Sequence, residues 1–495
     1  MNSLSDLIIV FFKVLTVNYS LYLGRIKTHY PSKALLAKII ENDKKISELS
    51  LKINEIMSIA SNSVNEEDII QLNIINKLLD RMDCEKRIEH IPFENKVDIK
   101  KYPLYFCCIK ALDYALDTVE YNDSYHDEDG NIVSSQIKII VCNILNKRSL
   151  FQKYTNVLKD DIDFICEVRD NGGEDLEDFQ YEALLIFLLI KIYILNYLNI
   201  SLNYSYERKV AHYTNIDVAM MLIEKNTKLR LVSPEFMNDP SEGNMLFKFM
   251  NISPESSDDL GKEQLNFFSC FTFNHNSLNQ FRLYGRKELI ECSGVSLTIN
   301  NKFFQENDSF NLYRCIYIEP KTGYLEVAKR SKWSFFQEYA DTKSIDDIER
   351  LYWRYSKSIT LRNKLLSHGV LLMKSLANIY DNSKNKIFLK ILDHILTSLK
   401  FLFKHFSFKE EEECRLMTIG TLSSPSVTYD KKLNSTYIEY SKDVSDYLDN
   451  IYLGVASKDL LTAIKISALG KCSNLPKIKV SDNPYRVYKT IDKLS

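Results

Sequence analysis

Apolar residues recur at helical spacing through most of the first 200 residues. Ile39, Ile46 and Ile53 lie seven residues apart beside charged residues, which predicts a short coiled-coil seam, and residues 72–82 carry a second stripe. Two such stripes in succession indicate a helical hairpin. Further helices are predicted at 101–120, 135–158 and 179–202. We therefore interpret residues 1–205 as a helical scaffold or docking domain.

From Arg208 onward, short strand-like runs replace the long helical stripes. Val210–Thr214 predicts a strand, and Thr214 or Asn215 can cap a helix that continues to Asn226. Further strands are predicted at 229–233, 267–273, 295–299, 313–318 and 414–419, with a strand, a helix and a strand within 452–480. Residues 331–405, rich in aromatic residues and leucine, predict a helical insertion. The expected fold class is α+β, with a mixed-sheet domain at 206–495 after the helical N-terminal domain.

The apolar run Ala183–Leu202 is long enough to cross a bilayer. Lys191, Asn196 and Asn199 interrupt it, and because polar groups are costly in hydrocarbon, a buried helix is the better interpretation. The run Leu7–Val17 is shorter, contains a lysine and lacks a basic segment before it, which argues against a secretory signal. We expect no stable membrane insertion.

The composition is that of a globular protein with more than one domain. Of 495 residues, 45% are hydrophobic and 26% are charged, and the formal charge of −2 provides no overall attraction to nucleic acid or anionic membrane. Ten cysteines are scattered without a CxxC pair, which suits reduced thiols better than a disulfide framework or a zinc site. These features predict a cytoplasmic bacterial protein, or one that is delivered into a host cell.

The polar motif with the sharpest chemistry is FKEEEECR at Phe408–Arg415. If it is a strand, alternation puts Glu411, Glu413 and Arg415 on one face. The other face, with Glu412, Cys414 and Leu416, includes core residues, so the first face meets a cleft or solvent. A carboxylate two residues from an arginine stays ionised at neutral pH, and such a glutamate can stabilise a developing oxocarbenium ion. A charged, solvated edge strand is the competing interpretation.

Two further motifs lie earlier in the predicted sheet domain. In HYT, His212 can donate a hydrogen bond to a sugar hydroxyl and Tyr213 offers a stacking face, although a histidine with a structural partner is an alternative. MNDPSEG, which ends at Gly243, has the residues of a turn. Its Asn238, Asp239 and Glu242 can contact a ligand, but helix capping explains Asp239 equally well.

The fourth motif is NQFRLYG at Asn279–Gly285. Arg282 suits a phosphate or carboxylate group, while Phe281 and Tyr284 suit base stacking; a helix docked by two aromatic residues is the alternative. The sequence has no phosphate-binding glycine loop, no HExxH and no GxSxG. ATP hydrolysis by a P-loop, zinc proteolysis and serine hydrolysis at a nucleophile elbow are therefore excluded.

In this order, the four motifs resemble those of a bacterial family known as a domain of unknown function. Its members read HYT, NDPxEG, QWRxYG followed by GVSL, and FKxExEWR, and the likeness covers roughly residues 208–495. Phe281 and Cys414 stand where the family has tryptophans. Both departures change packing, so the polar groups keep their expected roles.

That family's layout is in turn similar to ADP-ribosyltransferases, which hold NAD with a histidine on the first strand, an aromatic residue on the nicotinamide and a glutamate on a late strand. The resemblance implies that His212 has the first role and Glu413 the last, with Glu411 completing an ExE pair. It leaves the aromatic residue open among Tyr213, Phe271 and Tyr284.

The motifs and the resemblance together predict an NAD-dependent ADP-ribosyltransferase with NAD as its substrate and no metal. Glu413 and Glu411 are the expected catalytic residues, His212 would anchor the adenosine ribose, and Arg282 the pyrophosphate. Other expected NAD contacts are Tyr213, Thr214, Asn238, Asp239 and Tyr284. The target would be a protein or nucleic acid bound partly by the helical N-terminal domain, as in a delivered effector or a phage-defence toxin.

Two alternatives remain open at the level of sequence. Asp239, Glu242, Glu411 and Glu413 could gather magnesium in a metal-dependent nuclease. A non-enzymatic interaction protein, whose second half is a degraded fold, is the other alternative.

Chelation of metal ions distinguishes the ADP-ribosyltransferase from the magnesium-dependent nuclease. We expect NAD cleavage by the purified protein to be unchanged in excess EDTA, because no step of it needs a metal, whereas magnesium-dependent cleavage of nucleic acid would stop. The measurement is nicotinamide release with and without chelator. NAD cleavage that stops in EDTA and returns with magnesium would contradict the assignment of the two glutamates.

Overall fold

The computed structural model describes most of the chain after residue 153 and scattered residues before it. Beyond that point the described ranges are 154–170, 178–200, 209–224, 227–234, 243–252, 264–285, 290–304, 310–380, 385–431, 434–472 and 474–484. The chain divides into two compact units. The first comprises Met1–Asn196, Met250–Glu255 and Leu366–Leu396, and the second comprises Tyr197–Phe249, Ser256–Leu365 and Thr397–Ser495. Part of the predicted 331–405 insertion is thus grouped with the first unit.

The helices α7 (Thr155–Asp170) and α8 (Asp178–Leu198) account for most of what is described before residue 197. Lys191, in the buried middle of α8, donates to the Asp161 carboxylate of α7 at 2.6 Å, and burial raises the pKa of Asp161 to about 6. The lysine in the long apolar run therefore belongs to an internal ion pair. No described helix is long and apolar enough to cross a membrane. The predicted coiled-coil positions 39, 46, 53 and 72–82 lie outside the described residues.

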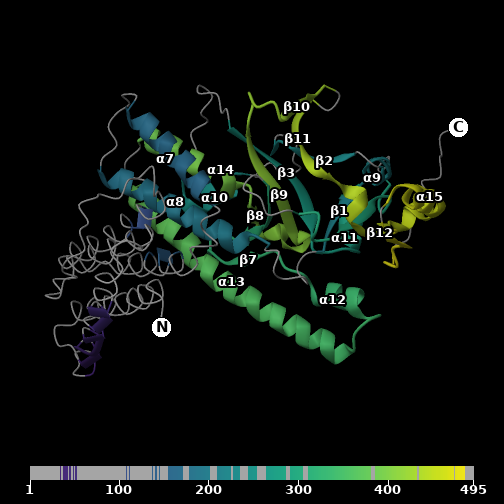
Figure 1. Ribbon diagram of the computed structural model, residues 1–495, viewed down its shortest axis with the longest axis horizontal. Coiled ribbons are helices and arrows are strands. Elements are labelled where there is room, and N and C mark those ends of the chain that lie inside the picture. The colour runs from purple at the N-terminus through teal and green to yellow at the C-terminus, as the bar shows by residue number, and fades with distance from the viewer. Residues whose placement is uncertain are drawn as a thin grey trace. The chain divides into compact units, whose positions relative to one another are not determined.

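The second unit is built on a ten-stranded mixed sheet (Figure 1). The strand order is β10-β11-β2-β3-β1-β4-β12-β13, with β9 paired to both β3 and β5. Its pairs are antiparallel except β12 with β13. The strands are β1 (Val210–Thr214), β2 (Lys228–Val232), β3 (Gln264–Thr272), β4 (Val295–Ile299), β5 (Asn311–Arg314), β9 (Glu413–Thr421), β10 (Val427–Asp430), β11 (Ser435–Asp443), β12 (Leu448–Leu453) and β13 (Lys477–Val480).

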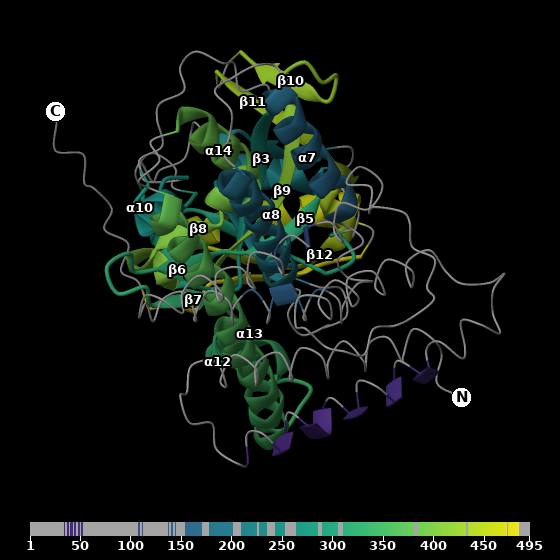
Figure 2. The same cartoon turned by 90° about the vertical axis from the view of Figure 1, so that its left-hand side faces the viewer.

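A second, three-stranded sheet has the order β7-β6-β8 (Figure 2). Its strands are β6 (Ile316–Ile318), β7 (Leu325–Val327) and β8 (Phe403–His405). Cys315 separates β5 from β6, and its amide donates to the Glu413 carbonyl at 3.0 Å. The chain thus passes from the large sheet to the small one beside the start of β9.

Helices alternate with these strands along the chain. Asn215 caps α9 by accepting from the Val218 amide at 2.8 Å, and α9 packs against α15 over the core of the large sheet (Figure 1). The α-helices after residue 200 are α9 (Ile216–Ile223), α10 (Met245–Met250), α11 (Leu278–Leu283), α12 (Lys332–Tyr339), α13 (Ile345–Tyr380), α14 (Lys386–Lys400) and α15 (Leu461–Lys471). The 3-10 helices are η6 (Phe406–Glu411), η7 (Val444–Tyr447) and η8 (Val455–Leu460).

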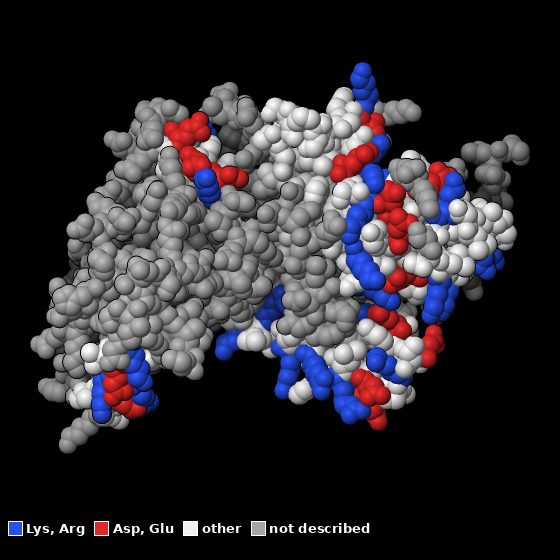
Figure 3. Space-filling view, in the orientation of Figure 1, with Lys and Arg blue, Asp and Glu red and all other residues white. Residues whose placement is uncertain are grey.

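Acidic and basic side chains are interspersed over much of the described surface in Figure 3. This distribution is consistent with the formal charge of −2.

The predicted strands are confirmed at β1, β2, β3, β4, β9, β12 and β13, with shifts of a few residues at their ends. The helix after β1 ends at Ile223 rather than at Asn226, and the predicted strand 313–318 is two strands. The sequence prediction misses β7, β8 and the β10–β11 hairpin. A mixed α/β structure with a large mixed sheet is nonetheless what the α+β prediction requires.

One glycine joins two of the polar motifs through the backbone. Gly285, the last residue of NQFRLYG, has φ of +73°, and a Cβ there would lie 2.2 Å from the carbonyl oxygen of Thr214 in HYT. Side chains rarely adopt this backbone conformation, and a carbonyl oxygen cannot move aside as a flexible side chain can. Glycine at this position therefore lets the end of β1 touch the loop after α11.

We expect Gly285→Ala to lower the free energy of unfolding by about 3 kcal/mol or more, because it adds a clash to a strained backbone. Chemical denaturation measures this loss. Gly470→Ala is the matched control, since Gly470 lies in α15 and a Cβ there meets nothing within 4 Å. That change should be neutral or stabilise by about 0.5–1 kcal/mol. Equal effects of the two substitutions would contradict the proposed contact.

Candidate functional site

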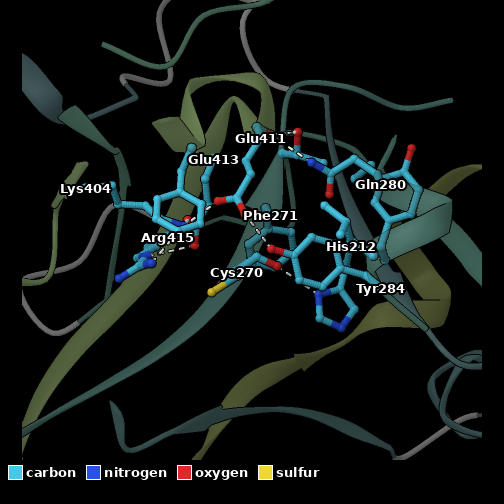
Figure 4. A pocket seen from close by; sticks show the side chains of 14 residues that line it. His212, Cys270, Phe271, Gln280, Tyr284, Lys404, Glu411, Glu413 and Arg415 are labelled. Carbon is cyan, nitrogen blue, oxygen red and sulfur yellow. Dashed lines mark hydrogen bonds and ion pairs between the residues drawn. The ribbon is translucent and has the colours of Figure 1, made fainter. Parts of the chain in front are cut away.

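The main-chain pairing between β1 and β3 of the large sheet is interrupted beside His212. β1 and β3 pair at a single position, Ala211 with Thr272, whereas β3 pairs with β9 along its whole length. At the next residue of β1, the His212 side chain takes the place of a main-chain donor, since its Nδ1 lies 2.9 Å from the Cys270 carbonyl oxygen. A cavity of about 310 Å³ lies at this opening (Figure 4). Its volume falls at the lower end of the range usual for small-molecule sites.

The cavity wall combines aromatic rings with a small set of charged groups, as ligand sites do. His212 and Tyr213 come from β1, Phe271 from β3, and Tyr284 from the end of α11 (Figure 4). Fourteen residues line it: Ala211, His212, Tyr213, Cys270, Phe271, Thr272, Gln280, Leu283, Tyr284, Lys404, Phe408, Glu411, Glu413 and Arg415.

Four charged side chains form a continuous line of ion pairs along this wall (Figure 4). Arg415 donates to Glu413 through Nε at 2.8 Å and through Nη2 at 3.1 Å. Lys404 donates to Glu413 at 2.6 Å and also to Glu411. The Tyr284 hydroxyl ends the line by donating to Glu411 at 2.7 Å. Two cations and two carboxylates therefore balance in formal charge.

The burial of Glu413 makes this balance necessary, because only 6% of the residue is exposed. Burial raises the pKa of Glu413, but the charges of Arg415 and Lys404 outweigh it and hold that pKa below its ordinary value. Burial lowers the pKa of Lys404, yet its two carboxylate neighbours raise it above the usual range. Glu413 is therefore ionised at neutral pH, as its spacing from Arg415 predicts.

The four consecutive glutamates lie in four different surroundings. Glu410 accepts from Asn279 Nδ2 at 2.9 Å, Glu411 faces the cavity, and Glu412 accepts from the Lys329 amide at 2.6 Å. Glu413 begins β9. The chain can spread them in this way because Glu411 ends a 3-10 helix and Glu412 has φ of +44°.

The strand alternation predicted for this motif is therefore wrong at Glu411, although Glu411 and Glu413 do line the same cavity. The alternative of a solvated edge strand is also wrong. β9 has a partner on each side, β3 and β5, and Arg415 is only 1% exposed.

His212 offers an acceptor rather than a donor. Burial lowers the pKa of His212, so the ring is neutral at neutral pH. The Cys270 carbonyl can only accept, so Nδ1 carries the proton and Nε2 is left as an acceptor. A ligand hydroxyl can donate to Nε2, which reverses the donor role predicted for His212.

The NQFRLYG motif holds the acidic segment in place. Gln280 Nε2 donates to the Glu411 carbonyl at 3.3 Å, and the Tyr284 hydroxyl binds the carboxylate of the same residue. Arg282 lies apart from the first cavity: it pairs with Glu291 at 3.1 Å and lines a second hollow of about 290 Å³. The two hollows share Gln280, Leu283, Phe408 and Glu411, so they adjoin each other.

Tyr213 and Thr214 have structural partners. The Tyr213 hydroxyl donates to the Asn274 carbonyl and accepts from the Ser277 amide, both at 2.9 Å. Its ring meets Phe281 edge to face at 5.0 Å, and Phe281 is itself buried, which is the packing role expected of it from the sequence. Tyr213 still lines the cavity, whereas Thr214 does not. The aromatic predictions therefore stay open among Tyr213, Phe271 and Tyr284, which all line the cavity.

The MNDPSEG motif is described only at its last residue; Asn238, Asp239 and Glu242 lie outside the described residues. Gly243 has φ of +78°, and a Cβ there would lie 2.8 Å from the ring of Phe401. The Phe401 carbonyl in turn accepts from Arg415 Nη1 at 2.6 Å. Gly243 therefore lies close to Phe401, whose carbonyl helps to hold the guanidinium beside Glu413.

The cavity residues that sequence reasoning did not predict include Lys404, Gln280 and Cys270. Lys404 had a usable signal, because a lysine flanked by apolar and aromatic residues, a few positions before an acidic run, suits a buried cation on a strand. Gln280 lies inside a motif already singled out. We find no sequence signal for Cys270.

Glu412 gives the site a pH-dependent stability. Burial raises the pKa of Glu412 to about 7 although the Lys329 amide lowers it. Its contribution to stability is thus fully present below the ordinary pKa of 4.5 and is lost as the pH rises through about 7. Glu412→Gln keeps an acceptor for the Lys329 amide. At alkaline pH we expect the free energy of unfolding of this variant to be about 2 kcal/mol higher than that of the unsubstituted protein.

The free energies of unfolding of Glu412→Gln and the unsubstituted protein should differ little at about pH 5, where the Glu412 carboxyl of the folded protein keeps its proton. Urea denaturation at about pH 5 and about pH 8 measures both differences. A gap of the same size at the two pH values would show that Glu412 does not titrate near neutrality.

Comparisons with known proteins add no relative to this picture: no protein-family model, no curated protein and no solved structure matches the chain. The likeness of the four motifs to a bacterial family, and of that family to ADP-ribosyltransferases, stays a prediction from the sequence.

Proposed function

We propose that the protein is an NAD-dependent ADP-ribosyltransferase that modifies a macromolecular target. One observation supports this above the others: His212 and Glu413, two hundred residues apart in the sequence, line the same cavity on either side of β3. A histidine on the first strand and a glutamate on a late strand that meet at one hollow are what the resemblance requires. A sheet built for packing alone has no need of a buried carboxylate there.

The chemistry follows from the carboxylates. The bond between the nicotinamide nitrogen and the ribose carbon breaks, and its electron pair leaves with nicotinamide. The ribose carbon then carries oxocarbenium-like charge until a nucleophile of the target bonds to it. Because Arg415 and Lys404 balance the two carboxylates, stabilisation has to come from an oxygen of Glu413 or Glu411 held close to the ribose, not from net negative charge.

The rest of the wall suits the remaining parts of NAD. His212 Nε2 accepts from a ribose hydroxyl, and Phe271 or Tyr284 offers a ring for stacking. The first cavity is small for a whole dinucleotide, but the adjoining second hollow extends it toward Arg282. The pyrophosphate would therefore lie near the shared wall, where Arg282 can compensate its charge.

We keep the wider assignments as part of the proposal. The target is a protein or nucleic acid, selected partly by residues 1–205, and the protein acts in the bacterial cytoplasm or in a cell into which it is delivered. A defence toxin or an effector fits such an activity.

The nuclease alternative is less well supported. A magnesium ion needs several oxygen ligands at once, and Lys404 and Arg415 already bind oxygens of Glu411 and Glu413, whereas the proposed NAD chemistry needs only one of these oxygens close to the ribose. Among the described residues, no group of three or more His, Cys, Asp or Glu side chains is spaced to hold a metal ion.

Glu413→Gln tests the proposal. The amide keeps the shape of the side chain but removes its charge, so we expect NAD cleavage to fall at least about 100-fold with the fold retained. Purified protein is incubated with labelled NAD and bacterial lysate, and both free nicotinamide and transferred label are measured. Glu439→Gln, an exposed glutamate on β11, is the matched control and should keep full activity. A folded Glu413→Gln protein with full activity would remove the assignment.

A further inference from the structure

One cation stands between the two carboxylates of the cavity. Lys404 Nζ contacts an oxygen of Glu411 and lies 2.6 Å from Oε2 of Glu413, and the lysine itself is only 5% exposed. It comes from β8 of the small sheet, whereas Glu413 belongs to the large sheet and Glu411 to the 3-10 turn between them. The ammonium is therefore the point at which three separate elements meet.

The groups around Lys404 show why a charge is needed there. Arg415 already makes two hydrogen bonds to Glu413, whereas among the described residues the cation that contacts Glu411 is Lys404, with the Tyr284 hydroxyl on the other oxygen of that carboxylate. Two carboxylates on one desolvated wall repel each other, so without the ammonium one of them would take up a proton or turn away. Other described groups near the two carboxylates include Tyr317, whose hydroxyl accepts from the Glu413 amide, the thiols of Cys270 and Cys315, and the Phe408 ring.

We propose that Lys404 is a positioning residue of the cavity, whose ammonium holds the Glu411 and Glu413 carboxylates side by side toward a bound ligand. It need not touch the ligand. Glu411 lies on a turn of one 3-10 helix, so it is the carboxylate that would move if the ammonium were lost, while Arg415 would still hold Glu413 to the sheet. The kinetic part of this inference rests on the proposed function, but its structural part does not.

The first test is a carboxyl titration that needs no activity. In protein with carbon-13-labelled glutamate side chains, Glu413 is assigned by comparison with Glu413→Gln and its titration is followed by NMR. We expect Lys404→Met to raise the pKa of Glu413 by at least about one unit and Lys404→Arg to leave it depressed. Lys409→Met is the matched control, because Lys409 pairs with Glu326 outside the cavity, and it should leave Glu413 unchanged.

The second test is the pH profile of NAD cleavage. With Lys404→Met, the acidic limb of kcat/KM should move to higher pH by about one unit, a tenfold loss at a fixed pH on that limb, and Lys404→Arg should restore it. A merely structural lysine would change the amount of folded protein but not the position of the limb. A wild-type protein that cleaves no NAD would remove the proposed function and leave the titration to decide on Lys404.

If Lys404→Met does not fold, the stability of a double variant tests the inference instead. Lys404→Met combined with Glu411→Gln removes one positive and one negative charge together, so it should recover stability that the single substitution loses. Recovery supports the inference. The inference is overturned if the double variant is no more stable than the single one, or if a folded Lys404→Met protein titrates Glu413 as the unsubstituted protein does.

Discussion

The cavity depends on keeping a carboxylate charged where water barely reaches it. A lone buried carboxylate is so costly that it would take up a proton, and Glu413 avoids this because a guanidinium and an ammonium satisfy its oxygens. These cations come from different sheets, Arg415 from β9 and Lys404 from β8. The ionised state of Glu413 therefore depends on the position of the three-stranded sheet, because that sheet supplies Lys404.

The polar motifs matter less as separate ligand contacts than as supports for one another. Gly285 of the third motif touches the end of the first, and Gly243 of the second touches Phe401, whose carbonyl holds Arg415 of the fourth. Such close approaches fix the wall before any ligand arrives, and preorganisation of this kind is what lets charged groups act on a developing charge. They also explain why several residues with plausible binding chemistry, such as Tyr213, are already hydrogen-bonded within the protein.

The strands that carry the site could be predicted because their apolar runs are local features of the sequence, as at β1 and β4. The grouping of His212, Tyr284, Glu411 and Glu413 at one cavity followed from motif order, not from periodicity. The prediction of strand alternation in the acidic run was wrong because Glu412 has a left-handed backbone conformation. Glutamate rarely adopts this conformation, so the sequence does not indicate it. The apolar and aromatic neighbours of Lys404 could have indicated a buried cation, but its two carboxylate partners become evident only once the fold has brought Glu411 and Glu413 together.

The seam between β1 and β3 has a further consequence, since a side chain replaces a main-chain donor there. A ligand hydroxyl that donates to Nε2 of His212 polarises the imidazole and makes Nδ1–H a stronger donor to the carbonyl of Cys270. Ligand binding and the hydrogen bond between β1 and β3 then strengthen each other, so the two strands are held together most firmly when the cavity is occupied.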